Sequence, residues 1–124
     1  MSANARRKPR ILVVEDEALV AFTLTEMLEE LGCEPIGPIA TADEALRCLP
    51  STTIDAAVVD LLLRGVDAWP VAEALAARKV PFVLATGWSV ETLPPHWEGC
   101  RVLTKPYQLS DLQSVMSGLL PQAP

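Results

Sequence analysis

Five polar side chains stand at the ends of four separate apolar runs in this sequence. They are Glu15 and Asp16 after the first run, Asp60 in the second, Thr86 in the third and Lys105 after the fourth. Three carboxylates that share one pocket repel each other and need a cation, and an all-oxygen set of ligands suits Mg²⁺. A carboxylate can attack phosphorus, while a metal ion and an ammonium group neutralise charge on the phosphoryl oxygens. These residue types therefore indicate phosphoryl chemistry if the fold brings them together.

Asp60 is the candidate nucleophile, because it stands inside the apolar stretch 57–63. An unpaired carboxylate is costly to bury, so such a residue usually lies at a strand end or beside a cation. Taken alone, Asp60 could equally cap the turn or helix that follows. Lys105 could be a surface lysine, Thr86 a strand-end residue, and the two acids at 15 and 16 helix caps. Their joint occurrence at several strand ends favours one common site.

Apolar runs that are typical of strands alternate with segments of helical spacing. This alternation predicts a parallel sheet with helices on both faces, and ligands of such sheets bind at the carboxyl ends of the strands. The five candidate side chains should therefore converge at one edge of the sheet. We expect strands at 10–15, 33–40, 54–60, 81–86 and 100–104, and helices at 18–31, 42–49, 68–79 and from 108 or 110 to about 119.

Prolines and polar residues refine three of these elements. Two prolines in the segment 33–40 predict an edge strand, because proline cannot donate to a ladder. Thr41 is the expected N-cap of the second helix, with Glu44 completing a capping box. The pair Pro94-Pro95 excludes a long helix between 88 and 100, so a fourth helix there should be short or distorted.

The segment 64–67, between the third strand and the third helix, should be a loop.

Helical spacing also predicts which helix faces are buried. We expect an inward stripe on the first helix at Leu19, Phe22, Leu24, Met27, Leu28 and Leu31, and on the third helix at Val71, Ala72, Leu75 and Ala76.

Length and composition limit the class of protein. A chain of 124 residues, half of them hydrophobic, predicts one domain at 9–120, with a flexible N-terminal tail at 1–8 and a C-terminal tail at 121–124. The net charge of −6 argues against a nucleic-acid partner. There is no apolar run of membrane-spanning length and no signal peptide. Three widely spaced cysteines fit neither a disulfide framework nor a zinc site, which predicts a cytoplasmic protein.

With these motifs in order, the sequence resembles the receiver domain of two-component response regulators over about residues 9 to 120. The matching motifs are Ile-Leu-Val-Val-Glu-Asp-Glu at 11–17, Val-Val-Asp at 58–60, Leu-Ala-Thr-Gly at 84–87 and Thr-Lys-Pro-Tyr at 104–107. The resemblance implies a flavodoxin-like fold with strand order 2-1-3-4-5. It also implies that the bond between Lys105 and Pro106 is cis.

The resemblance assigns a role to each candidate residue. Asp60 is expected to be phosphorylated, and Glu15 and Asp16 form the acid pair for Mg²⁺, with Asp16 and Asp60 as ligands. The main-chain carbonyl of Leu62 supplies another metal ligand. Thr86 is expected to be the switch hydroxyl and Lys105 the cation that pairs with the phosphate.

Two departures from the common receiver pattern point to a subgroup. Leu62-Leu63 stands near the position where many receivers carry Met-Pro, and Val102 replaces their rotating aromatic residue. The stretch 81–88 with its Phe-Val-Leu-Ala-Thr-Gly-Trp sequence resembles receivers that have a Phe-Ala-Thr-Gly motif and a shortened fourth helix, often as stand-alone domains. Trp88, Val102 and Tyr107 are the expected modulators, and bulky groups at Leu62 and Trp88 should slow hydrolysis by excluding water.

The resemblance implies a single-domain response regulator. It would take a phosphoryl group from a sensor histidine kinase or a phosphotransfer protein and signal through protein contacts to an unknown downstream partner, as a monomer or weak homodimer. It would not be an enzyme beyond its own phosphorylation and dephosphorylation. The alternative is a receiver-like binding module that does not use phosphate. A phosphatase or flavin carrier fits poorly, because Leu62 replaces the phosphatase's second aspartate and the acidic loop 15–17 replaces the flavin carrier's hydroxyl- and glycine-rich loop.

Overall fold

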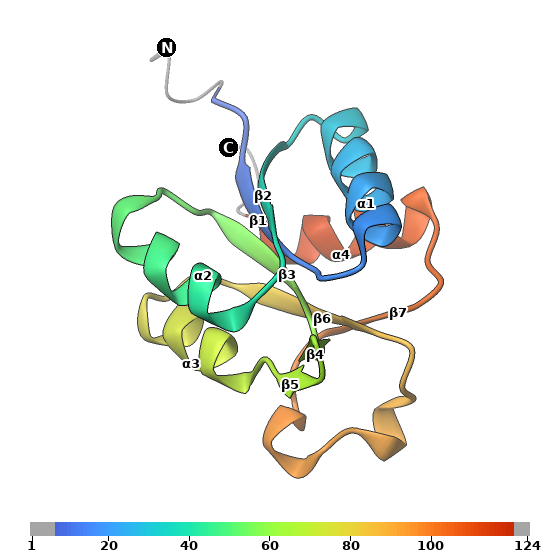
Figure 1. Cartoon of the computed structure of the whole chain (residues 1–124). Coiled ribbons are helices and arrows are strands. Elements are labelled where there is room, and N and C mark those ends of the chain that lie inside the picture. Colours follow the sequence, from blue (N-terminus) through green and yellow to red (C-terminus); the bar gives the residue numbers. More distant parts are fainter. Residues whose placement is uncertain (1–6, 121–124) are drawn as a thin grey trace.

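Five parallel strands form the central sheet of this computed structural model, which describes residues 7–120. Their order is β2-β1-β3-β6-β7 (Figure 1), so the predicted flavodoxin-like order and the edge position of the proline-bearing strand are both confirmed. The ends of the predicted tails, at 1–6 and 121–124, lie outside the described residues. The strands are β1 (Arg10–Val14), β2 (Glu34–Ile39), β3 (Ala56–Asp60), β6 (Phe82–Thr86) and β7 (Val102–Thr104).

Helices cover both faces of this sheet. In Figure 1, α1 and α4 lie on one face and α2 and α3 on the other. Alternate residues of β1 divide between the two cores: Ile11 packs in the cluster that holds residues of α1 and α4, and Leu12 in the cluster that holds residues of α2 and α3. Both faces of the strand are therefore buried, which explains its continuous apolar sequence. The helices are α1 (Ala18–Glu30), α2 (Ala42–Cys48), α3 (Trp69–Ala77) and α4 (Leu109–Leu119).

Side chains cap two of the helices. The Thr41 hydroxyl accepts a hydrogen bond from the backbone N–H of Glu44 (3.2 Å), as predicted for the start of α2. The Glu44 carboxylate accepts from the Thr41 hydroxyl, and not from the backbone N–H of Thr41, so only half of the predicted capping box forms. At α4, Gln108 and Asp111 form a capping box. No helix in the part of the chain that the structure describes could span a membrane.

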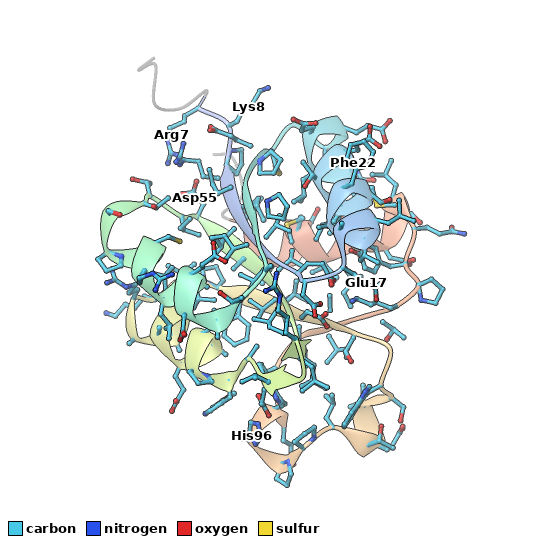
Figure 2. All side chains as sticks on the ribbon, in the orientation of Figure 1. Arg7, Lys8, Glu17, Phe22, Asp55 and His96 are labelled. Atoms are coloured by element: carbon cyan, nitrogen blue, oxygen red, sulfur yellow. The ribbon has the colours of Figure 1, made fainter. Side chains whose placement is uncertain are left out.

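The predicted inward stripe of α1 is partly wrong. Leu19 and Phe22 are exposed, at 76% and 59%, and Figure 2 shows Phe22 on the outer side of the helix. The fully buried residues are Ala21, Leu24 and Leu28. Leu19 precedes Ala21 by two residues, about 200° around an α-helix, so it faces away from this stripe. On α3, Ala76 is likewise exposed, while Val71 and Leu75 are buried as predicted.

The segment 64–67 is the turn and second strand of a tight hairpin, and not the loop that the sequence predicts. Strands β4 (Leu62–Leu63) and β5 (Val66–Asp67) pair in antiparallel fashion. Arg64 and Gly65 form the two-residue turn, with φ angles of 54° and 80°. Positive φ at both central residues is the geometry that two-residue hairpins favour.

No regular helix lies between β6 and β7, as the proline pair predicts. Two short 3-10 helices stand there, η3 (Val90–Thr92) and η4 (Pro95–Trp97). We call residues 88–100 the β6–β7 connection; Figure 1 shows it in orange, beyond the carboxyl ends of the strands. Trp97 is fully buried and anchors this connection to the core that contains α2 and α3.

Candidate functional site

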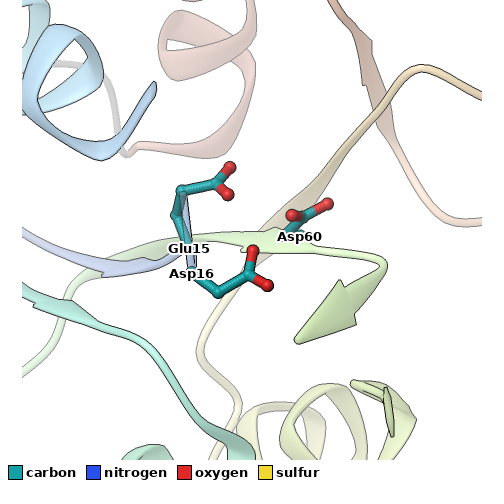
Figure 3. A group of neighbouring side chains, drawn as sticks. All are labelled: Glu15, Asp16 and Asp60. Carbon is teal, nitrogen blue, oxygen red and sulfur yellow. The ribbon is translucent and has the colours of Figure 1, made fainter. Parts of the chain in front are cut away.

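Three carboxylates gather at the carboxyl edge of the sheet. Glu15 and Asp16 follow β1, and Asp60 ends β3, which pairs directly with β1. One carboxylate oxygen from each residue lies within 4.8 Å of the others, and Figure 3 shows the three groups around a common space. The structure thus brings together the three acids that the sequence singles out. Hard oxygen donors at this spacing suit a divalent cation such as Mg²⁺.

Lys105 supplies a positive charge to this cluster. Its Nζ lies 2.8 Å from Oε1 of Glu15 and 3.4 Å from Oδ2 of Asp60. Its backbone N–H donates to the carbonyl of Thr86 (2.8 Å), which fixes the start of the β7–α4 connection beside β6. The bond to Pro106 is cis, as expected. Four of the five predicted side chains therefore meet directly.

Backbone amides orient each of the three acids. The N–H of Leu61 donates to Oδ1 of Asp60 (2.8 Å), and the N–H of Glu17 donates to Oε2 of Glu15 (3.0 Å). Asp16 accepts through Oδ2 from the N–H of Arg64 in the hairpin turn (2.8 Å). Sequence patterns do not identify this amide, and the adjacent Gly65 is its only signal in the sequence. These bonds hold the carboxylates in place before any ligand arrives.

The charges of the site depend on burial and on neighbouring groups. Burial, with the negative charge of Glu15, raises the pKa of Asp60 to about 7, although Lys105 opposes this shift. The hydrogen bond from Arg64 lowers the pKa of Asp16. Burial acts to lower the pKa of Lys105, but the hydrogen bond to Glu15 and the charge of Asp60 outweigh it, and the pKa is raised. Without a bound metal ion, Asp60 is thus only partly ionised at neutral pH.

Thr86 is buried at the end of β6 and is held by the loop that follows. Its Oγ1 accepts a hydrogen bond from the backbone N–H of Trp88 (3.1 Å). Because this contact uses an oxygen lone pair, the hydroxyl proton stays available for another acceptor. The indole of Trp88 itself is 44% exposed.

The remaining predicted residues surround this cluster. Leu62 opens β4 and its side chain is 38% exposed. Val102 is half-buried in β7. Tyr107 is half-buried near the acids, and burial raises the pKa of its phenol to about 12, so the hydroxyl stays protonated.

Comparison with known proteins decides the family. Residues 11–117 match the model of the response regulator receiver domain. This chain is a member of that family. The receiver resembles the solution structure of SdrG from Sphingomonas melonis Fr1, with 41% identity and a TM-score of 0.80 over 96% of this chain and 98% of that one. Receiver domains are signalling modules of two-component systems.

Two further proteins extend the comparison. The transcriptional regulatory protein PdtaR of Mycobacterium tuberculosis is 31% identical over 89% of this chain and 56% of its own length, so the chain spans about half of that relative. The receiver domain of the sensor histidine kinase PA1611 from Pseudomonas aeruginosa PAO1 has the same fold, with 24% identity, a TM-score of 0.75 and coverage of 91% of this chain and 98% of that one. That structure has a magnesium ion coordinated in its active-site cleft.

Proposed function

We propose that this receiver accepts a phosphoryl group onto Asp60 in a reaction that depends on Mg²⁺. The donor is a phosphohistidine of a sensor histidine kinase or a phosphotransfer protein, in the cytoplasm. A carboxylate oxygen of Asp60 forms the new P–O bond as the P–N bond breaks, and the imidazole leaves. The observation that carries this proposal is the position of Asp60, within 4.8 Å of two further acids and 3.4 Å from the ammonium of Lys105.

The donor set fits Mg²⁺. We assign the ion to the carboxylates of Asp16 and Asp60 and to the main-chain carbonyl of Leu62. When bound, Mg²⁺ neutralises charge on the phosphoryl oxygens. The raised pKa of Asp60 supports this assignment, because a cation relieves the repulsion that Glu15 exerts on the ionised carboxylate. Glu15 then acts mainly through Lys105, whose ammonium it holds at 2.8 Å.

Lys105 and Thr86 bind the phosphoryl group after transfer. The Lys105 ammonium already faces Asp60 and pairs with a phosphoryl oxygen there. The Thr86 hydroxyl donates its proton to another oxygen while it still accepts from the N–H of Trp88. This contact links the phosphoryl group to the β6–β7 connection, and Trp88, Val102 and Tyr107 modulate the response.

The output of the receiver is a protein contact. The acidic balance of the chain does not favour a nucleic-acid partner. We infer that the receiver is a monomer or weak homodimer, and that it belongs with the receivers that carry a Phe-Ala-Thr-Gly motif. The likeness to SdrG over nearly the full length of both chains supports this inference.

Label transfer from a phosphorylated kinase, or from acetyl phosphate, tests the proposal. The wild-type protein should incorporate label when Mg²⁺ is present and should incorporate none when EDTA removes the ion. Asp60→Asn should abolish incorporation, whereas Asp43→Asn, at an exposed position of α2, should leave it unchanged. Wild-type label that persists in Asp60→Asn contradicts the assignment. A wild-type protein that takes up no label from any donor favours the phosphate-independent binding module.

A further inference from the structure

The carboxylate of Asp67 is the centre of a second polar cluster, outside the acidic site. Its Oδ1 accepts hydrogen bonds from the backbone N–H of Trp69 (2.8 Å) and from the indole Nε1–H of Trp97 (3.2 Å). Its Oδ2 lies 2.7 Å from Nε2 of His96. Because a carboxylate only accepts, Nε2 of His96 carries the proton in this contact. We call Asp67, Trp69, His96 and Trp97 the Asp67 cluster.

Aromatic packing reinforces these hydrogen bonds. Trp69 packs edge-on against both Trp97 and His96, with ring centroids 5.1 Å and 5.2 Å apart. Trp97 is fully buried, so its indole N–H has to find its acceptor inside the protein. In Figure 2, His96 lies on the β6–β7 connection beside the β4–β5 hairpin. The cluster thus fixes this connection to the hairpin through specific contacts.

The hairpin is also attached to the acidic site at its other end. It begins two residues after Asp60, and the N–H of Arg64 in its turn donates to Asp16 (2.8 Å). The N–H of Ala68 donates to the carbonyl of Leu61 (2.9 Å), which closes the base of the hairpin. A change at Asp60 or Asp16 therefore acts on the same small unit that carries Asp67.

The β6–β7 connection has its own link to the site through Thr86, whose hydroxyl holds the N–H of Trp88. Two loops thus leave the acidic site, one after Asp60 and one after Thr86. They meet again at the Asp67 cluster, where residue 67 contacts residues 96 and 97. A closed loop of contacts of this kind can transmit a change in either direction.

We propose that Asp67 is a positioning residue that couples phosphoryl-group and Mg²⁺ binding at the acidic site to the arrangement of the β6–β7 connection. This inference rests on the proposed function. The contacts of Asp67 hold the hairpin that presents the Leu62 carbonyl to the metal. A ligand at the acidic site then stabilises the contacts of the cluster by some factor. By linkage, loss of those contacts weakens ligand binding at the acidic site by the same factor.

The NMR resonances of the indole N–H groups of the three tryptophans measure this coupling directly. Mg²⁺ with beryllofluoride serves as the phosphoryl probe, and SdrG has a beryllofluoride-activated conformation. In the wild-type protein, the probe should shift the resonance of Trp97 as well as that of Trp88. In Asp67→Ala, the Trp88 response should persist while the Trp97 response is lost, and the affinity for Mg²⁺ should fall by about fivefold.

Two milder variants keep the test decisive if Asp67→Ala folds poorly. Asp67→Asn retains the acceptor for both N–H groups and should keep most of the Trp97 response. His96→Ala removes only the contact to Oδ2 and should weaken the Trp97 response and the affinity for Mg²⁺ together. Glu91→Gln is the matched control, because it removes an exposed charge from the same connection and leaves the Asp67 contacts intact.

The outcomes separate this inference from the proposed function. If the wild-type protein binds the probe but Asp67→Ala and His96→Ala keep the full Trp97 response and Mg²⁺ affinity, the coupling is wrong and the phosphoryl site stands. If the wild-type protein gives no response to the probe at any resonance, both fail. A Trp97 shift in the wild type that is lost in Asp67→Ala and restored in Asp67→Asn supports the coupling.

Discussion

The pKa of Asp60 is set by its burial and by two neighbours of opposite charge. Glu15 repels its negative charge, and Lys105, 3.4 Å away, attracts it. Burial is the larger cause and the charge of Glu15 adds to it, so the pKa rises from 3.8 to about 7. The proposed nucleophile is therefore only partly ionised at neutral pH unless a metal ion is bound. An anionic carboxylate is the form that attacks phosphorus, so the same cation that relieves the repulsion prepares the nucleophile.

This balance predicts a pH-dependent effect of Asp60→Asn on stability. A carboxyl group whose pKa is higher in the folded state destabilises the fold as the pH rises from the unfolded value of 3.8 through about 7. In EDTA, Asp60→Asn should therefore raise the melting temperature more at about pH 8 than at about pH 5, and Mg²⁺ should reduce the difference. Thermal unfolding of both proteins measures this. An equal gain at the two pH values would contradict the raised pKa.

The β4–β5 hairpin matters at the level of elements. It is only six residues long, yet it is the expected source of the Leu62 carbonyl and it supplies the amide that orients Asp16. Its turn depends on Gly65, whose φ is 80°. A Cβ at this position would meet no described atom within 4 Å, so only the backbone conformation resists a side chain.

Gly65→Ala should therefore lower the stability by about 1 kcal/mol through backbone strain. It should also weaken Mg²⁺ binding, because it disturbs the amide that holds Asp16. Gly32→Ala is a matched control: its φ is 84°, a Cβ again meets nothing within 4 Å, and it lies after α1, away from the site. Both variants should lose similar stability, and only Gly65→Ala should lose affinity in a Mg²⁺ titration. Equal affinities in the two variants would separate the turn from metal binding.

We expect Trp88 to affect the lifetime of the proposed aspartyl phosphate. Its backbone N–H donates to the Thr86 hydroxyl, and its indole is half-exposed. Trp88→Ala should shorten the lifetime of the aspartyl phosphate by a few-fold, because water then reaches the phosphorus more easily. Decay of label after the donor is removed measures this, with Val90→Ala as the control at a more exposed position. An unchanged lifetime would exclude a protective role for the indole.

At the level of the whole molecule, the sequence predicts the sheet and the convergence of the acidic site well. Parallel strands bring their carboxyl ends to one edge, so residues that are remote in the chain, such as Asp16 and Lys105, can be assigned to one place from their position after apolar runs. The prolines of β2 likewise predict its edge position.

Other features depend on tertiary contacts that no local pattern records. Helical spacing does not determine how wide a face the sheet covers, so Leu19 and Phe22 were wrongly expected to be buried. The contact of Asp67 with His96 joins residues 29 positions apart, one on the β4–β5 hairpin and one in the irregular β6–β7 connection. Only the folded structure identifies the Asp67 carboxylate as the acceptor for the buried indole of Trp97.

The most direct test of the account is to identify the residue that carries the phosphoryl group. After phosphorylation with Mg²⁺, reduction with borohydride converts an aspartyl phosphate into homoserine, and peptide mass spectrometry then identifies the modified position. We expect homoserine at position 60, absent when EDTA is added and absent from Asp60→Asn. Modification at another residue, or at position 60 without a divalent cation, would contradict it.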